Sequence, residues 1–147
     1  MRITIQDLNK WKANTLALAR ELSLDDNILA MLEGCKVEII PGNSGRYFYG
    51  FSDYGPPKVR VFERNPSKYF PRALWEVWNQ SGMDHELIGH IYSYYSGFRH
   101  DEFAARQIQV GIARRRGRNN FLWRLASLAE PTLRTVQKYR NYLVYKK

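Results

Sequence analysis

Two of the three histidines in this chain, His85 and His90, lie five residues apart in a segment that reads Asp84-His85-Glu86-Leu87-Ile88-Gly89-His90. In a regular α-helix, residues four apart lie about 40° from each other around the axis, and residues five apart lie about 140° from each other. One extra residue accommodated as a π-bulge would return both imidazoles to one side, and Gly89 would ease that distortion. The interval therefore predicts either a local π-helical turn with converging histidines or two unrelated helix histidines with ordinary hydrogen bonds.

The hydrophobic pattern predicts an α+β fold. Apolar residues recur at helical spacing over 6–34, where Asp25 and Asp26 cap a second short helix that ends at Gly34. Three strands are then expected, at 36–40, 46–51 and 58–63, separated by turns at 41–45 and 52–57. The remaining chain predicts helices at 71–80, 83–96, 101–116, 119–129 and 131–144.

Composition limits the class of protein. The chain has 147 residues, of which 44% are hydrophobic, and this favours one domain over 1–147 with a real core. The single cysteine, Cys35, excludes an internal disulfide and a thiolate-rich zinc finger, and it is expected to be a small buried residue. With no apolar N-terminal segment and no apolar run long enough to cross a bilayer, we expect a cytoplasmic protein without a membrane partner.

The positive charge is concentrated in the last third of the chain. The formal net charge is +9, but residues 1–98 hold 11 basic and 11 acidic side chains, whereas residues 99–147 hold 12 and 3. A balanced globular part is therefore followed by a basic helical segment at about 114–147. The cluster formed by Arg114, Arg115, Arg116 and Arg118 is typical of a surface that binds nucleic acid or an acidic partner, or of a solvated helical face.

The histidine segment resembles a known metal motif. His85-Glu86-Leu87-Ile88-Gly89-His90 is similar to the His-Glu-x-x-Gly-His motif of the dipeptidyl peptidase III family of zinc peptidases. More broadly, a helix with His-Glu…His followed by a helix with Glu resembles the gluzincin metallopeptidases, including minimal single-domain members. The resemblance implies a zincin-like fold with an N-terminal helix, a small three-stranded sheet, an active-site helix, a glutamate helix and C-terminal helices. It does not extend to the dipeptide-releasing activity of that family.

The resemblance also implies roles for the residues. His85, His90 and Glu102 would bind Zn²⁺, and Glu86 would act as the general base that activates water for hydrolysis of a peptide or protein substrate. His100 is an alternative third ligand, since three histidines also suit zinc.

Several further side chains are candidates near such a site. Asp84 or Asp101 would orient a ligand imidazole through a hydrogen bond. A hydroxyl of Tyr94 or Tyr95 would stabilise an oxyanion, unless these tyrosines serve only for packing. An extended substrate would pair with an edge strand, and the residues expected there are Val59, Arg60 and Val61, with Pro56-Pro57 ending the pairing.

Three functions remain open from the sequence. The first is a zinc-dependent peptidase. The second is a basic nucleic-acid-binding module whose metal site is structural or inert. The third is a latent or inactive zincin scaffold whose cleft is covered by its own C-terminal helices.

Overall fold

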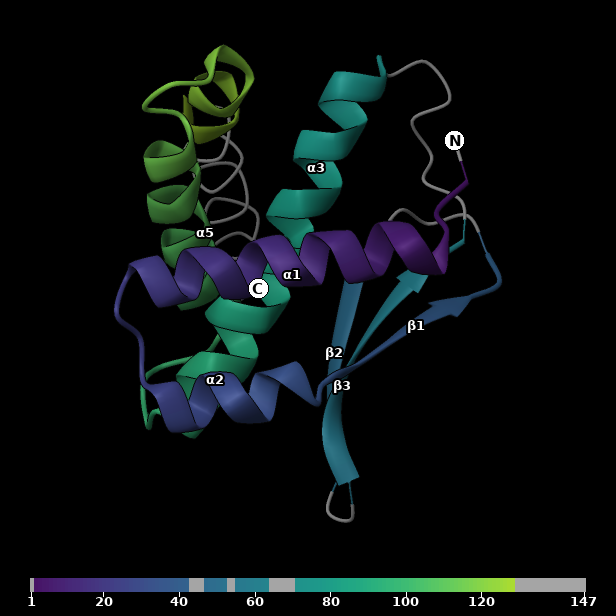
Figure 1. Cartoon of the computed structure of the whole chain (residues 1–147), viewed down its shortest axis with the longest axis vertical. Helices are drawn as coiled ribbons and strands as arrows, with labels where there is room; N and C mark the ends of the chain where they lie inside the picture. Colours follow the sequence, from purple (N-terminus) through teal and green to yellow (C-terminus); the bar gives the residue numbers. More distant parts are fainter. Residues whose placement is uncertain (1, 43–46, 53–54, 64–70, 129–147) are drawn as a thin grey trace, which may run out of the picture.

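The computed structural model describes residues 2–42, 47–52, 55–63 and 71–128 (Figure 1). Within these ranges the chain has a mixed α+β architecture in which helices predominate around a small sheet. None of the described helices combines the length and the apolar character that crossing a bilayer requires.

Two capped helices open the chain. Helix α1 (Ile5–Glu21) begins with a capping box, in which the Thr4 hydroxyl accepts from the Asp7 amide and the Asp7 carboxylate accepts from the Thr4 amide. Helix α2 (Asp26–Glu33) begins where the Asp25 carboxylate accepts from the amides of Asn27 and Ile28. The predicted division of 6–34 into a long and a short helix is therefore confirmed.

The sheet has three strands in the order β1-β3-β2. Strand β1 (Lys36–Ile40) is parallel to β3 (Gly55–Phe62), and β2 (Tyr47–Ser52) is antiparallel to it. Strand β3 is therefore central, and Val59 and Val61 are buried. The prediction that Val59, Arg60 and Val61 form an edge strand is wrong, because neighbouring strands already occupy both sides of β3.

Strand β3 begins earlier than predicted, because it includes Pro56 and Pro57. Two features of the pairing tolerate these prolines, which cannot donate a ladder hydrogen bond. The register between β2 and β3 shifts between Gly50 and Ser52, and the pairing with β1 starts only at Lys58. The expected turn over 52–57 is thus shorter than predicted.

The next described element is one long helix with no break along its length. It consists of α3 (Arg72–Asp84), the π-helical segment η1 (His85–Tyr92) and α4 (Ser93–Tyr95). The sequence predicted separate helices at 71–80 and 83–96, but the intervening residues are helical as well. The π-helical turn inferred from the five-residue histidine interval is confirmed.

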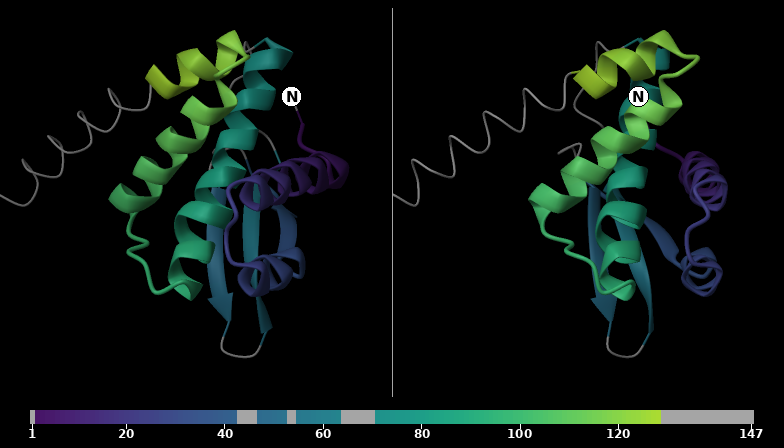
Figure 2. Two further views of the ribbon diagram at one scale, coloured as in Figure 1. Left: turned by 60° about the vertical axis from the view of Figure 1, so that its left-hand side comes forward. Right: turned by 90° about the vertical axis from the view of Figure 1, so that its left-hand side faces the viewer.

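Segment η1 lies at the centre of the molecule. It contacts α5 (Glu102–Arg116) on one side, α1 and α2 on the other, and strands β2 and β3 of the sheet (Figure 2). All eight residues of η1 are buried, because these helices and strands pack around it. The largest fully buried apolar side chains of the core come from α1, α2, β3, α3 and η1: Leu8, Trp11, Leu29, Leu32, Val59, Val61, Trp75, Met83, Leu87 and Ile91.

A buried ion pair joins three helices just before η1. The Asp84 carboxylate is fully buried and accepts from Arg116 Nε and Nη2 at 3.0 and 2.9 Å. It also accepts from the Thr15 hydroxyl at 2.7 Å and from the Gln80 amide at 3.3 Å. Helices α1, α3 and α5 are thereby held by one polar cluster whose charges are paired and hydrogen-bonded.

Replacing Arg116 by Met is expected to leave Asp84 buried without a counter-charge. The expected loss is about 3–5 kcal/mol of unfolding free energy, measured by urea denaturation. Arg115→Met is the matched control, because the ion pair that Arg115 makes with Glu21 among the described residues is long, at 3.9 Å, and the change should alter stability by less than about 1 kcal/mol. Equal losses in both variants would contradict a special role for the buried pair.

Candidate metal centre

Three side chains from two helices converge at one point. Nε2 of His85 lies 3.1 Å from Nε2 of His90 and 3.2 Å from Oε1 of Glu102, and Nε2 of His90 lies 3.1 Å from Oε2 of Glu102. Tetrahedral ligands at zinc–nitrogen bond lengths are separated by about 3.3 Å. Among the described residues, this is a histidine–histidine–carboxylate group that can hold a metal ion.

The π-helical conformation of η1 is what brings His85 and His90 together. Its hydrogen bonds span five residues rather than four, so the two imidazoles lie on one side with ring centroids 4.8 Å apart. The Ser93 hydroxyl donates to the Ile88 carbonyl at 2.9 Å, which satisfies an acceptor near the return to α-helix.

Both imidazoles are held with Nε2 directed at the site. Nδ1 of His85 contacts Oε1 of Gln109 at 2.9 Å, and the Gln109 amide nitrogen donates to Ser81 Oγ at 2.7 Å. Nδ1 of His90 contacts the main-chain carbonyl of His100 at 2.6 Å. Because each Nδ1 faces an acceptor oxygen, each carries the hydrogen and leaves an Nε2 lone pair for a metal. Two lone pairs at this separation repel each other, and a cation between them removes the repulsion.

The Glu102 carboxylate closes the triangle and remains ionised. When an imidazole is protonated at Nε2 as well as at Nδ1, it donates to Glu102, and such hydrogen bonds from His85 and His90 hold the pKa of Glu102 well below its usual range, with a further contribution from Arg106. A bound cation would take the place of these Nε2 hydrogens. Burial by itself would lower the pKa of His90, but Glu102 and Glu86 together raise it. The carboxylate is half-exposed, whereas both imidazoles are buried, so solvent reaches the cluster from the Glu102 side.

The Glu86 carboxylate has a buried oxygen that no hydrogen bond from the described part of the chain satisfies. It is buried, and its Oε2 has no hydrogen-bond partner among the described residues. Burial raises the pKa of Glu86 to about 6, although His85 and His90 act in the opposite direction. An unpaired buried oxygen is costly, and a solvent molecule drawn to a cation at the three ligands would satisfy it. The residues present therefore fit a metal site with a buried carboxylate beside it.

Close backbone packing sets the distance between the two ligand-bearing helices. A Cβ added at Gly89 would lie 2.9 Å from Ala105 Cβ, 3.0 Å from its Cα and 3.1 Å from its carbonyl oxygen. Gly89 was expected to ease the distortion of the helix, but it also admits the backbone of α5. The small residue at Ala105 serves the same contact, and Glu102 lies one turn away from it on α5.

A single face of α5 makes the contacts with α3 and η1. The residues of this face follow one another at intervals of three, four and seven residues, which is helical spacing: Glu102 meets the histidines, Ala105 meets Gly89, Gln109 meets His85, and Arg116 meets Asp84. Sequence reasoning missed Gln109. Its position seven residues after Glu102, on the same face of a predicted helix, is the signal that could have identified it.

Neither carboxylate predicted to orient an imidazole contacts one. Asp84 is paired with Arg116, as described above. Asp101 caps α5 by accepting from the Ala104 amide at 3.0 Å, so it fixes the turn that carries Glu102. The orienting contacts come instead from a side-chain amide and a main-chain carbonyl.

The predicted third-ligand alternative and the two predicted oxyanion tyrosines lie outside the ligand cluster. His100 contributes its carbonyl to His90, and its ring packs against Tyr94 with centroids 5.3 Å apart, so Glu102 rather than His100 joins the cluster. Tyr94 and Tyr95 lie on α4 and are exposed, with their rings 5.1 Å apart. Their role at an oxyanion stays a prediction.

The four arginines that were predicted to form one binding surface have different surroundings in the structure. Arg114 is exposed, Arg115 pairs with Glu21, Arg116 is committed to Asp84, and Arg118 is exposed on the turn after α5. Residues 121–128 are helical, which agrees with the predicted helix at 119–129. The predicted helix at 131–144, and with it the latent-peptidase hypothesis, lies outside the described residues.

No protein-family model, curated protein or solved structure matches this chain.

Replacing Gly89 by Ala is expected to separate η1 from α5. The added methyl group meets backbone atoms that cannot move independently, so we expect a loss of about 1–3 kcal/mol of stability and a tenfold or greater loss of Zn²⁺ affinity. Competition with a chromophoric chelator and thermal unfolding measure the two effects.

Gly111→Ala provides the matched control. Gly111 lies on α5, where an added Cβ meets nothing within 4 Å. The same change there should stabilise the helix by about 0.5–1 kcal/mol and leave metal affinity unchanged. Unchanged metal affinity in Gly89→Ala would show that close packing does not set the ligand geometry.

Proposed function

We propose that this chain is a zinc-dependent peptidase of zincin type that hydrolyses peptide bonds. The observation that carries the proposal is the convergence of His85, His90 and Glu102 beside Glu86, a buried carboxylate with an unpaired oxygen. A purely structural metal site has no use for an adjacent base, and two unrelated histidines have no use for a rare π-helical turn.

The donor set suits zinc. Two neutral imidazoles and one carboxylate carry a single negative charge, so a bound divalent cation keeps a net positive charge. Calcium and magnesium prefer oxygen ligands, whereas a His₂Glu set is typical of catalytic zinc. When bound by these three residues, zinc supplies Lewis acidity that lowers the pKa of water and polarises a carbonyl.

Glu86 is suited to move the proton. Its Oε2 is free to accept a proton from the attacking water and then to deliver it to the departing amine nitrogen. With a pKa near 6, the carboxylate is a stronger base than an exposed glutamate and is still ionised at neutral pH.

Substrate access is proposed along β2 rather than β3. Strand β2 lies at the edge of the sheet and packs beside η1. An extended peptide added to that edge would run past the segment that carries the ligands, with its backbone held by strand pairing. This placement replaces the predicted pairing with Val59, Arg60 and Val61.

Glu86→Gln is expected to abolish hydrolysis while zinc is retained. The amide keeps the shape of the side chain but cannot accept the proton, so peptide cleavage should fall by about 10²–10⁴-fold. Because the substrate is unknown, a mixture of peptides is incubated with the zinc-loaded protein and cleavage is followed by mass spectrometry. Metal content is measured on the same samples.

Two further variants define this test. Glu38→Gln, on the exposed side of the sheet, should leave both zinc content and cleavage unchanged. Glu102→Gln should weaken zinc binding, since it removes a charged ligand. Full activity of zinc-loaded Glu86→Gln, or no cleavage by zinc-loaded wild type, would contradict the proposal.

The rate of peptide hydrolysis is expected to fall at acidic pH. As pH falls through the pKa of Glu86, the base becomes protonated, and kcat/KM should drop about tenfold per pH unit below that value. A bound cation favours the ionised carboxylate, so the midpoint of this fall in kcat/KM should lie at or below about pH 6. Zinc content is followed at each pH, because protonation of His90 also competes with the metal. A rate that is flat down to pH 4 with zinc still bound would exclude Glu86 as the base.

A further inference from the structure

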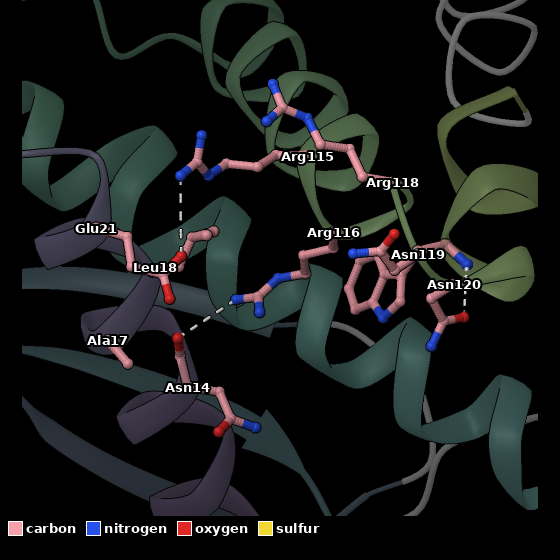
Figure 3. A pocket seen from close by; sticks show the side chains of 10 residues that line it. Asn14, Ala17, Leu18, Glu21, Arg115, Arg116, Arg118, Asn119 and Asn120 are labelled. Carbon is pink, nitrogen blue, oxygen red and sulfur yellow. Dashed lines mark hydrogen bonds and ion pairs between the residues drawn. The ribbon is translucent and has the colours of Figure 1, made fainter.

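A second candidate site lies at the opposite end of α5 from Glu102. The pocket has a volume of about 500 Å³ and lies between α1 and the turn that follows α5 (Figure 3). One side of the lining comes from α1, and the other comes from the end of α5, the turn after it and the helix at 121–128: Asn14, Ala17, Leu18 and Glu21 on the first side, and Arg115, Arg116, Arg118, Asn119, Asn120 and Trp123 on the second.

The lining carries three arginines and one acidic residue, and the arginines are not equivalent. Arg116 is bound to the buried carboxylate of Asp84, and its guanidinium lies over the Trp123 ring at 5.3 Å. Arg115 makes a long ion pair of 3.9 Å with Glu21. The guanidinium of Arg118 is exposed and has no acidic partner among the described residues. An anion in the pocket would therefore meet one free guanidinium and one weakly engaged guanidinium.

The turn that presents Arg118 is fixed before any ligand arrives. The Arg124 guanidinium donates to the carbonyls of Gly117 and Arg118 at 2.8 and 2.9 Å. Asn120 caps the helix at 121–128 by accepting from the Leu122 amide at 3.0 Å. A wall held in this way loses little conformational entropy when it binds a ligand.

Uncharged groups complete the pocket. Three asparagines supply amide donors and acceptors, and Ala17, Leu18 and Trp123 supply apolar surface. Guanidinium groups match the oxygens of a phosphate with paired hydrogen bonds. The volume exceeds what one phosphate group fills, and it falls within the range of small-molecule sites.

We propose that this pocket binds a small phosphorylated molecule through a phosphate dianion held by Arg118 and Arg115. The rest of the ligand, of nucleotide or sugar-phosphate size, lies against the asparagines and the apolar floor. The site is separate from the metal cluster and does not depend on peptidase activity. It also differs from a nucleic-acid surface, because it relies on the arginines that line the pocket rather than on the summed charge of the segment.

Titration calorimetry on the full chain tests the proposal. The probes are inorganic phosphate, adenosine monophosphate and adenosine at constant ionic strength. Arg118→Gln should weaken adenosine monophosphate binding by at least tenfold, since it removes a charge-assisted contact. Arg114→Gln is the matched control: it removes the same charge on an exposed residue four positions earlier that does not line the pocket, and affinity should stay within twofold.

The outcomes separate the possible ligand sources. Binding of both phosphate probes, with adenosine inactive, supports the proposal, and comparable affinity for inorganic phosphate would identify the free ion as a sufficient ligand. Equal weakening by Arg114→Gln and Arg118→Gln would overturn it in favour of a diffuse basic surface. Binding of adenosine as tight as that of its monophosphate, or no binding of either phosphate probe at millimolar concentration, would also overturn it.

Discussion

The backbone contact between Gly89 and Ala105 is the constraint on which the rest of the structure depends. A carboxylate on a neighbouring helix reaches two buried imidazoles only if the helix axes lie close together, and a larger residue at either position would hold them apart. At this separation, Glu102 reaches the histidines at one end of α5, and Arg116 reaches Asp84 at the other end. One small-residue contact thus fixes two polar clusters that are several turns apart.

Polar contacts then fix how the two helices are aligned along their length. An apolar interface tolerates sliding by a turn, but the contacts of His85 with Gln109 and of Asp84 with Arg116 do not, because a shifted helix would leave these buried groups unpaired. Close approaches or hydrogen bonds therefore lie at both ends and in the middle of the interface. Burying these polar groups costs free energy, but the same contacts fix the positions of the metal-ligand atoms.

Local features of this chain were accessible from its sequence, and nonlocal ones were not. The five-residue interval between His85 and His90 indicates a π-helical turn if both histidines bind one metal, and Asp25 and Asp26 predict where α2 begins. The central position of β3 depends on a parallel pairing with β1, which strand patterns do not encode. The partner of Asp84 lies 32 residues away, and the partner of His90 is a main-chain carbonyl that any residue type could provide.

The π-helical segment has a consequence for the residues that follow it. Each extra residue in a helix advances the phase of all later side chains by about 100°. Ile91, Tyr92 and Ser93 are buried in the phase that follows this extra residue, and the Tyr92 hydroxyl accepts from the Asp25 amide at the start of α2. Removing one residue to restore the ordinary four-residue histidine spacing would therefore rotate Tyr92 away from α2. The packing of the residues after His90 therefore depends on the five-residue interval. A change to the four-residue interval would require these core residues to be repacked as well.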